Sequence, residues 1–115
     1  MVLGLLLGKT LNAGEAWILW LKAPTPAHTW GETWEIIEAF PTYQECKEAQ
    51  MQSFVGIRDS WKSSKTVNDL PVKEVAVTEV QFSWMTVWVY FKNGKEEFIG
   101  IYEWKCLSDT IDLRK

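Results

Sequence analysis

The chain has 115 residues and a mass of 13.3 kDa, which is room for one domain. Hydrophobic residues make up 47% of it, enough for a core, and eight tryptophans are its compositional peculiarity. A formal net charge of −3 supplies no basic field for nucleic acid or an anionic membrane surface, so we expect no nucleic-acid partner.

The first sixteen residues, MVLGLLLGKTLNAGEA, indicate an export signal rather than part of the fold. The apolar run from Val2 to Gly8 is far shorter than the roughly 20 residues of a membrane-spanning helix, so we expect no stable membrane span. Small residues that suit a signal peptidase follow it, although no basic residue precedes Lys9. We predict a signal peptide or its remnant at 1–13 and one domain at 14–115, in a periplasmic or secreted protein. The alternative is an ordinary hydrophobic first strand.

Two strands are predicted before the first helical pattern. The segment AWILWLKA (16–23) is bounded by Gly14 and Pro24 and is apolar on both faces, which is typical of a central strand covered on both sides. A loop rich in proline follows over 24–32. The next segment, TWEIIEAF (33–40), is interpreted as a second strand that forms a hairpin with the first.

The clearest local signal in the chain is the start of a helix in PTYQEC. Thr42 stands three residues before Glu45, which predicts a capping box that satisfies two backbone donors of the first turn reciprocally. We expect a helix from Tyr43 to Trp61, followed by a polar connection over 62–71. Apolar residues recur at near-helical spacing, with Gln50 as a polar gap, at Tyr43, Cys46, Phe54, Ile57 and Trp61.

From Val72 onward the sequence is β in character. The segment VKEVAVTEVQ favours an edge strand, and FSWMTVWVYF (82–91) is a second strand. Asn93-Gly94 predicts a hairpin with a type I′ turn, in which both central residues have positive φ. The return strand EEFIGIYEWKC is expected to carry on one face Phe98, Gly100, Tyr102, Trp104 and Cys106. The predicted fold class is α+β, an antiparallel sheet of about five strands with one helix packed across it, in the order β-β-α-β-β-β.

The strand at 82–91 has two different faces. One carries Phe82, Trp84, Trp88 and Tyr90, and the other carries Met85, Val87, Val89 and Phe91. The preferred interpretation buries the aromatic face beneath the helix, opposite Tyr102 and Trp104, because most aromatic stripes are packing. In the alternative, the helix covers the face of Met85, and the exposed aromatic face marks a partner, membrane or sugar-stacking surface.

The two cysteines either pair with each other or stay free. Cys46 lies in the first turn of the predicted helix and Cys106 at the end of the last strand. If the helix lies on the face of Trp104, Cys106 points toward it, and a bridge would stabilise the fold by roughly 4 kcal/mol through the unfolded chain. Export favours this disulfide, whereas two separately buried thiols are expected of a cytosolic protein.

Three segments, AWILW, AFPTYQEC and WKCLSDTIDLRK, together resemble a family of small exported bacterial proteins without an established activity. Its members open with a Trp-x-Leu-Trp strand, carry a helix-start Cys, and end in aromatic-x-Cys-Leu-Pro-Asp-Thr-Val-Asp-Pro-Arg. Ser108 and Leu113 stand here in place of the two prolines, and Ile111 in place of valine. The matching positions are Trp104, Cys106, Leu107, Asp109, Thr110, Asp112 and Arg114. The resemblance covers the two ends and the helix start, and it implies export, a Cys46–Cys106 bridge and no catalytic residue.

No pattern in the sequence indicates a catalytic residue, a metal site or a cofactor. His28 is the only histidine and lies in the proline-rich loop, where a solvent-exposed role is expected. Asp109 and Asp112 lie beside Arg114 in a tail, which indicates solvated charges or a local ion pair.

The hypothesis of a binding function rests on the abundance of tryptophan. The candidate contact residues are Trp30, Trp34, Trp84 and Trp88. We expect a non-catalytic exported domain, held by one disulfide, that binds a protein partner or forms a homo-oligomer. The alternative is a small-ligand or carbohydrate-binding module that uses exposed tryptophans. An enzyme is the third alternative, and it would need a cleft with strongly perturbed carboxylates or a metal.

Overall fold

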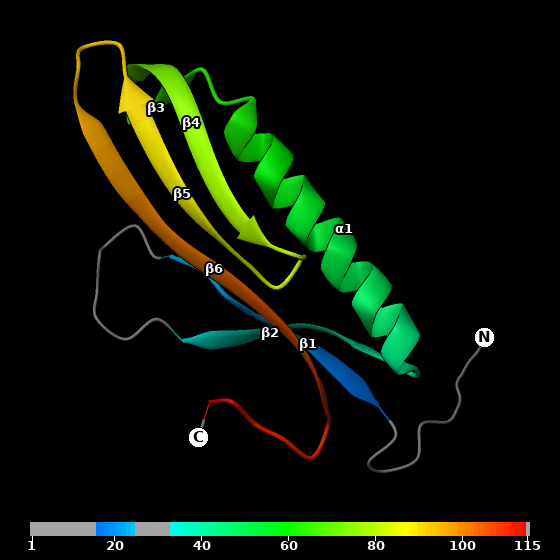
Figure 1. Cartoon of the computed structure of the whole chain (residues 1–115). Coiled ribbons are helices and arrows are strands. Elements are labelled where there is room, and N and C mark those ends of the chain that lie inside the picture. Colours follow the sequence, from blue (N-terminus) through cyan, green and yellow to red (C-terminus); the bar gives the residue numbers. More distant parts are fainter. Residues whose placement is uncertain (1–15, 25–32, 115) are drawn as a thin grey trace.

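The computed structural model of the protein describes residues 16–24 and 33–114, which form an α+β fold as predicted. Within these residues one helix lies on one side of a six-stranded antiparallel sheet of order β2-β1-β6-β5-β4-β3 (Figure 1). The elements are β1 (Trp17–Lys22), β2 (Trp34–Phe40), α1 (Tyr43–Lys62), β3 (Thr66–Val67), β4 (Leu70–Val80), β5 (Trp84–Phe91) and β6 (Glu96–Ser108). The sheet curls strongly, so that β1 and β2 cross behind β6 in the view of Figure 1.

The prediction of about five strands was incomplete, because the connection after α1 contains a further short strand. β3 pairs with the start of β4 through Thr66 opposite Pro71 and Val67 opposite Leu70. The two residues between them, Asn68 and Asp69, have φ values of 51° and 66°. Positive φ at both positions of a two-residue loop is the type I′ geometry, which Asn and Asp adopt more readily than most residues. The order is therefore β-β-α-β-β-β-β.

The predicted hairpin of the first two strands is confirmed. β1 pairs antiparallel with β2 on one side and with β6 on the other, so it is a central strand. Its successive residues Leu19 and Trp20 point to opposite faces of the sheet. Each is only 1% exposed, which confirms that both faces of β1 are covered.

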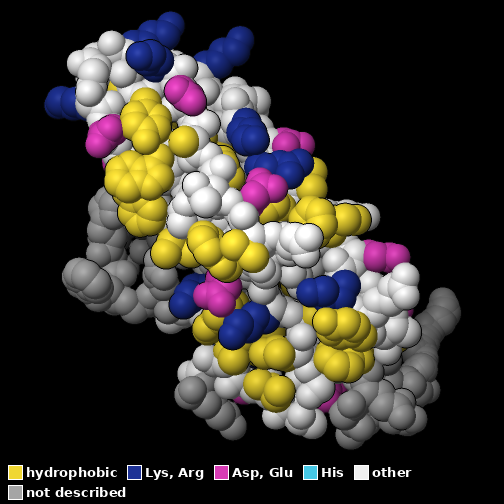
Figure 2. All heavy atoms as spheres, viewed as in Figure 1, with side chains coloured by type: hydrophobic (Ala, Val, Ile, Leu, Met, Phe, Trp, Pro, Cys, Tyr) yellow, Lys and Arg dark blue, Asp and Glu magenta, His cyan; other side chains and the backbone are white. Residues whose placement is uncertain are grey.

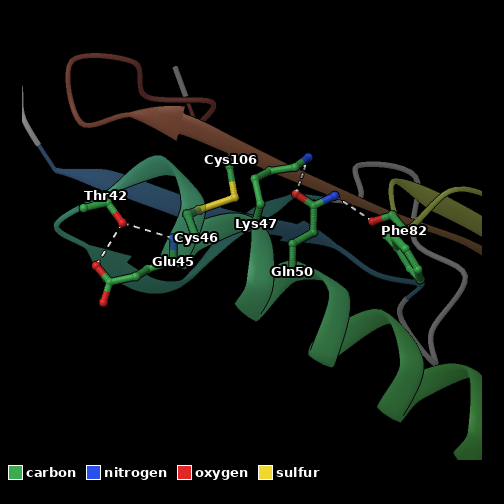
Figure 3. Close-up of a disulfide and its surroundings, with 7 residues drawn as sticks. All are labelled: Thr42, Glu45, Cys46, Lys47, Gln50, Phe82 and Cys106. Carbon is green, nitrogen blue, oxygen red and sulfur yellow. Dashed lines mark hydrogen bonds between the residues drawn. A yellow bond between two sulfur atoms is a disulfide. The ribbon is translucent and has the colours of Figure 1, made fainter.

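The helix begins where the capping signal predicts, although one of its two hydrogen bonds differs. The backbone N–H of Glu45 donates to the hydroxyl of Thr42 over 3.1 Å (Figure 3). The reciprocal bond runs between the side chains, since the Thr42 hydroxyl donates to the Glu45 carboxylate over 2.9 Å. At the other end Lys62 lies in the last turn, where a cation interacts favourably with the helix dipole.

The predicted hairpin between β5 and β6 is confirmed, but its turn is not of type I′. Gly94 has a φ of 92°, whereas Asn93 is not among the residues with positive φ. The loop is closed by the N–H of Phe91 on the carbonyl of Lys95 and by the N–H of Gly94 on the carbonyl of Phe91. The Asn93 side chain instead accepts a 2.8 Å hydrogen bond from the N–H of Lys95, which stabilises this longer loop.

The side of the sheet that α1 covers is the one that carries Met85, Val87 and Val89, all fully buried. The core between helix and sheet consists of Leu19, Cys46, Phe54, Met85, Val87 and Trp104. The preferred prediction, that the aromatic face of this strand lies beneath the helix, is therefore wrong. Trp88 remains 37% exposed on the opposite side.

A β-bulge in β6 explains why that prediction failed. Val87 pairs with Gly100 but the next residue, Trp88, pairs with Phe98, so Ile99 is an extra residue in β6. Side chains before and after the bulge therefore change faces. Phe98 lies beside Trp88 on the side away from the helix, whereas Tyr102, Trp104 and Cys106 lie on the helix side with the core. The predicted single face of β6 is split.

The backbone at the bulge requires glycine. Gly100 has a φ of 145°, and a Cβ placed on it would meet the Cγ of Pro24 at 2.6 Å. Both observations exclude a side chain at this position without movement of its neighbours. A glycine therefore sets the point at which β6 changes register.

The disulfide between Cys46 and Cys106 is confirmed (Figure 3). Their Cα atoms are 6.1 Å apart, within the usual range for a bridge. Cys46 is fully buried, so the bridge fastens the start of α1 to the end of β6 within the core.

Candidate functional site: the open face of the sheet

The side of β4, β5 and β6 that faces away from α1 carries six apolar side chains in adjacent rows, with Thr78 and Thr86 between them. Strand register places neighbouring members side by side, because Ala76 pairs with Trp88 and Trp88 with Phe98. We call this surface the open face, and it consists of Ala76, Val80, Trp84, Trp88, Phe98 and Ile101. Figure 2 shows large hydrophobic side chains over the half of β5 and β6 nearest their hairpin.

Four members of the open face are strongly exposed. Val80 is 46% exposed, Trp88 37%, Phe98 40% and Ile101 41%. The rings of Trp88 and Phe98 contact each other with centroids 5.0 Å apart and planes at 50°. A cross-strand aromatic pair of this kind stabilises a sheet. Large apolar side chains gathered on one solvent-facing surface also mark a binding site in many soluble proteins.

Charged residues border the open face at both ends. Toward the hairpin, Tyr90 pairs with Glu74 on one side and Glu96 on the other, and both carboxylates are exposed. At the opposite end, Lys22 and Glu103 form an ion pair of 3.8 Å. An apolar centre with a polar rim is the usual anatomy of a protein interface.

The four predicted contact tryptophans have different locations. Trp84 and Trp88 both belong to the open face. Trp34 lies on β2 on the same side of the sheet, in one cross-strand row with Lys22, Glu103 and Trp84. Three strand spacings of about 4.8 Å separate Trp34 from Trp84 by roughly 14 Å. Trp30, like His28 and the predicted signal at 1–13, lies outside the described residues.

Trp34 is half-buried and contacts two lysine side chains. The ammonium groups of Lys22 and Lys105 lie 5.2 and 5.4 Å from the centroid of its ring. Such cation–π contacts each stabilise by about 0.5–1 kcal/mol at exposed sites. The structure therefore does not bring Trp34 into the aromatic cluster of Trp88 and Phe98.

Four members of the open face were not among the predicted contact residues, namely Ala76, Val80, Phe98 and Ile101. Phe98 was assigned to the same face as Trp104, and the bulge at Gly100 separates them. A glycine within a strand pattern is a known sign of a bulge. That signal in EEFIGIYEW was the one that would have placed Phe98 correctly.

A second surface feature is a groove of about 550 Å³ between the start of α1 and the β4–β5 turn. Its lining residues are Tyr43, Gln44, Lys47, Glu48, Gln50, Met51, Gln81 and Phe82. Gln50, which interrupts the apolar stripe of the helix, is only 1% exposed. Its amide donates to the carbonyl of Phe82 over 2.6 Å and accepts from the ammonium of Lys47 over 3.2 Å (Figure 3). The polar gap in the helix thus holds the β4–β5 turn.

Phe82 in this turn adopts a left-handed backbone with a φ of 60°. This conformation costs a residue with a Cβ roughly 1–2 kcal/mol. The hydrogen bond from Gln50 compensates part of that cost, as does an edge-on contact of the Phe82 ring with Phe54 at 5.4 Å. Strained residues are concentrated at functional sites, which makes the groove a second candidate surface.

An ion pair between Arg114 and Asp112 lies in the C-terminal tail, outside both surfaces. The pKa of Arg114 is raised by its hydrogen bond and charge interaction with Asp112 in the C-terminal tail. Within the described ranges, no cluster of three or more histidine, cysteine or acidic residues is arranged to hold a metal ion. No helix of this part of the chain is long and apolar enough to cross a membrane.

Comparisons with known proteins give no match for the chain among family models, curated proteins or solved structures.

Proposed function

We propose that the protein is a non-catalytic interaction domain that binds a protein partner through the open face. The observation that carries this proposal is the exposed Trp88–Phe98 pair on the sheet surface that α1 does not cover. Tryptophan and other aromatic residues dominate the energetics of protein interfaces.

The exposed area of the two rings supports a central role for them in binding. Trp88 and Phe98 are 37% and 40% exposed. With roughly 200 Å² for each side chain, they present about 150 Å² to solvent. Burial of this area is worth up to about 4 kcal/mol at 25 cal/mol per Å². A stable interface covers about 800 Å² of each partner, so the partner would also contact the rest of the open face and its charged rim.

We propose further that the protein is exported and works in an oxidising compartment, as the resemblance to the exported family implies. The disulfide between Cys46 and Cys106 supports this proposal, because structural disulfides persist in secreted and periplasmic proteins and are rare in the cytosol.

The proposal is tested by affinity capture with two matched double variants. Trp88→Ser/Phe98→Ser removes the exposed aromatic pair of the open face. Ile36→Ser/Ile37→Ser removes two side chains of similar exposure, 45% and 46%, from the edge strand β2. Immobilised wild-type protein and the β2 variant should retain the same partner from an extract of the producing cells, and the open-face variant should lose it. Equal retention by all three proteins would contradict the proposal.

A small-ligand or carbohydrate-binding module is the second candidate function, and the groove beside Phe82 is the observation that favours it. Its volume of about 550 Å³ lies within the range of ligand sites, about 300–1,000 Å³. Glutamine amides supply donors and acceptors, and Tyr43 and Phe82 supply rings. On the open face itself, the tilt between Trp88 and Phe98 is less suited to a flat sugar platform.

A further inference from the structure

We infer that the open face binds a segment of another protein that carries a lysine or arginine beside apolar side chains. In this arrangement the cation lies over Tyr90, between Glu74 and Glu96, and the apolar side chains cover Trp88 and Phe98. The inference rests on the proposed binding function of the open face and names the chemistry of its partner. It is carried by two exposed carboxylates without an ion partner at one end of this face.

Tyr90 lies between two carboxylates in one cross-strand row. It pairs with Glu74 of β4 and with Glu96 of β6, so the three side chains lie on the same face of the sheet, away from α1. Neighbouring strands are about 4.8 Å apart, which sets each glutamate roughly 5 Å from Tyr90 along the row. Both glutamates are exposed, and Tyr90 is half-buried. Figure 2 shows acidic side chains on either side of the hydrophobic side chains nearest the hairpin.

The two carboxylates of this row are not neutralised within the described part of the chain. Neither Glu74 nor Glu96 forms a salt bridge with another described residue. At the opposite end of the open face, by contrast, Glu103 is paired with Lys22 over 3.8 Å. Two like charges that face solvent on either side of one ring both attract a positive ion placed between them. The hairpin end of the open face therefore has the chemistry to hold a cation.

Three lysines near this row restrict where the partner lies. Lys73 is the extra residue of a bulge in β4, and Lys92 and Lys95 lie in the hairpin loop. They repel a basic side chain placed beyond the row, but none of them forms a salt bridge with Glu74 or Glu96. The partner therefore extends from the row toward the apolar part of the open face.

Tyr90 itself supplies an aromatic ring for the cation. A lysine or arginine within about 6 Å of a ring centroid is attracted to the ring, as Lys22 and Lys105 are to Trp34 at 5.2 and 5.4 Å. Trp88 precedes Tyr90 by two residues, so its row lies roughly 7 Å away. The same spacing separates alternate side chains of an extended segment. A partner that sets a basic residue over Tyr90 can therefore set an apolar residue over the row of Trp88.

Charge favours this partner over an acidic segment and over a second copy of the chain. The formal net charge of the chain is −3, so a basic segment is attracted to it and two copies repel each other. An acidic segment would in addition be repelled locally by Glu74 and Glu96. Complementary charge of this kind determines which partner binds and how it is oriented.

Selection of a random dodecamer peptide library, displayed on phage, on the immobilised full chain tests the inference. We expect the enriched peptides to carry lysine or arginine within two positions of an aromatic or aliphatic residue. The most enriched peptide is then synthesised with its basic residue intact or replaced by glutamine. Its Kd is measured by fluorescence anisotropy at 150 mM salt. The replacement should raise the Kd about tenfold, because it removes both the ion pairs and the cation–π contact.

Two matched double variants locate the cation on the protein. Glu74→Gln/Glu96→Gln should raise the Kd of the basic peptide about tenfold and leave that of its glutamine analogue unchanged. Glu35→Gln/Glu38→Gln removes two exposed carboxylates from the edge strand β2 and should change either Kd less than twofold. All four positions are exposed, and circular dichroism monitors folding.

Two results would overturn the inference. The first is enrichment of acidic peptides, of apolar peptides without a basic residue, or of no peptide at all. The second is a basic peptide whose Kd does not respond to Glu74→Gln/Glu96→Gln. If the selected peptides still lose affinity in Trp88→Ser/Phe98→Ser, the open face binds without the cation and the proposed function stands. If they bind that variant as tightly as wild-type protein, and the captured partner does too, the proposed function fails as well.

Discussion

Reduction of the disulfide is expected to remove a large share of the stability of the domain. Cys46 and Cys106 are separated by 60 residues, so the bridge closes a long loop in the unfolded chain. In the chain-entropy model a loop of this length gives a stabilisation of about 4 kcal/mol. Small domains have a total free energy of unfolding of only about 5–15 kcal/mol, so the reduced protein should be marginally stable.

Urea unfolding followed by tryptophan fluorescence measures this effect. The protein is unfolded and refolded with or without a phosphine reductant, which gives the reduced and oxidised forms under otherwise equal conditions. With an m value of about 1.5 kcal/mol per M, the midpoint should fall by roughly 2 to 3 M on reduction. The double variant Cys46→Ala/Cys106→Ala serves as the control, since the reductant should not move its midpoint. A loss below about 1 kcal/mol in the wild-type protein would refute the reasoning from loop closure.

The remaining predictions concern backbone conformation. Gly100→Ala should lower the free energy of unfolding by more than about 2 kcal/mol, because the new Cβ would meet Pro24 at a positive φ. Gly56 lies in the exposed middle of α1, with no atom within 4 Å of a carbon added to it. Gly56→Ala should therefore raise the free energy of unfolding by about 0.5–1 kcal/mol. Equal effects of the two changes would contradict the assignment of the bulge. Phe82→Gly should be more stable than Phe82→Ala by about 1 kcal/mol in the same urea assay, because only glycine relieves the left-handed strain; an alanine variant of equal stability would argue against that strain.

The elements with a strong local signal could be predicted from the sequence. The Thr42–Glu45 capping box located the start of the helix, and apolar residues on both faces of 16–23 located the central strand. Asn93-Gly94 located the hairpin between the two long strands. In each case a few neighbouring residues determine the local structure, so the prediction of the element did not depend on the rest of the fold.

The orientation of the sheet relative to the helix could not be predicted, because both faces of β5 are apolar. Met85, Val87 and Val89 fill the core as well as the aromatic residues would, and alternation alone does not choose between the two faces. The decision depends on a single-residue register shift at Gly100, which moves Phe98 to one side and Trp104 to the other. The faces of Phe98 and Ile101 depend on this register shift. The predicted site therefore contained Trp84 and Trp88 but not Phe98 and Ile101.

The short hairpin of β3 and β4 was also missed. Asn68-Asp69 is a weaker turn signal than Asn-Gly, and the strand before it has only two residues. The groove was missed for another reason, since the contact of Gln50 with Phe82 joins residues 32 positions apart in the chain. No local pattern indicates that a polar residue within a helix will hold a distant turn.

Hydroxyl-radical footprinting of the tryptophan and phenylalanine side chains tests the exposure and occupation of the open face most directly. In dilute protein, Trp88 and Phe98 should be oxidised much faster than Trp20 and Trp104, which are 1% and 2% exposed. With its captured partner present, oxidation of Trp88 and Phe98 should fall while that of Trp20 and Trp104 stays low. If Trp88 is as protected as Trp104 in the dilute protein, or is equally oxidised in the free and bound protein, the open face is not the binding surface.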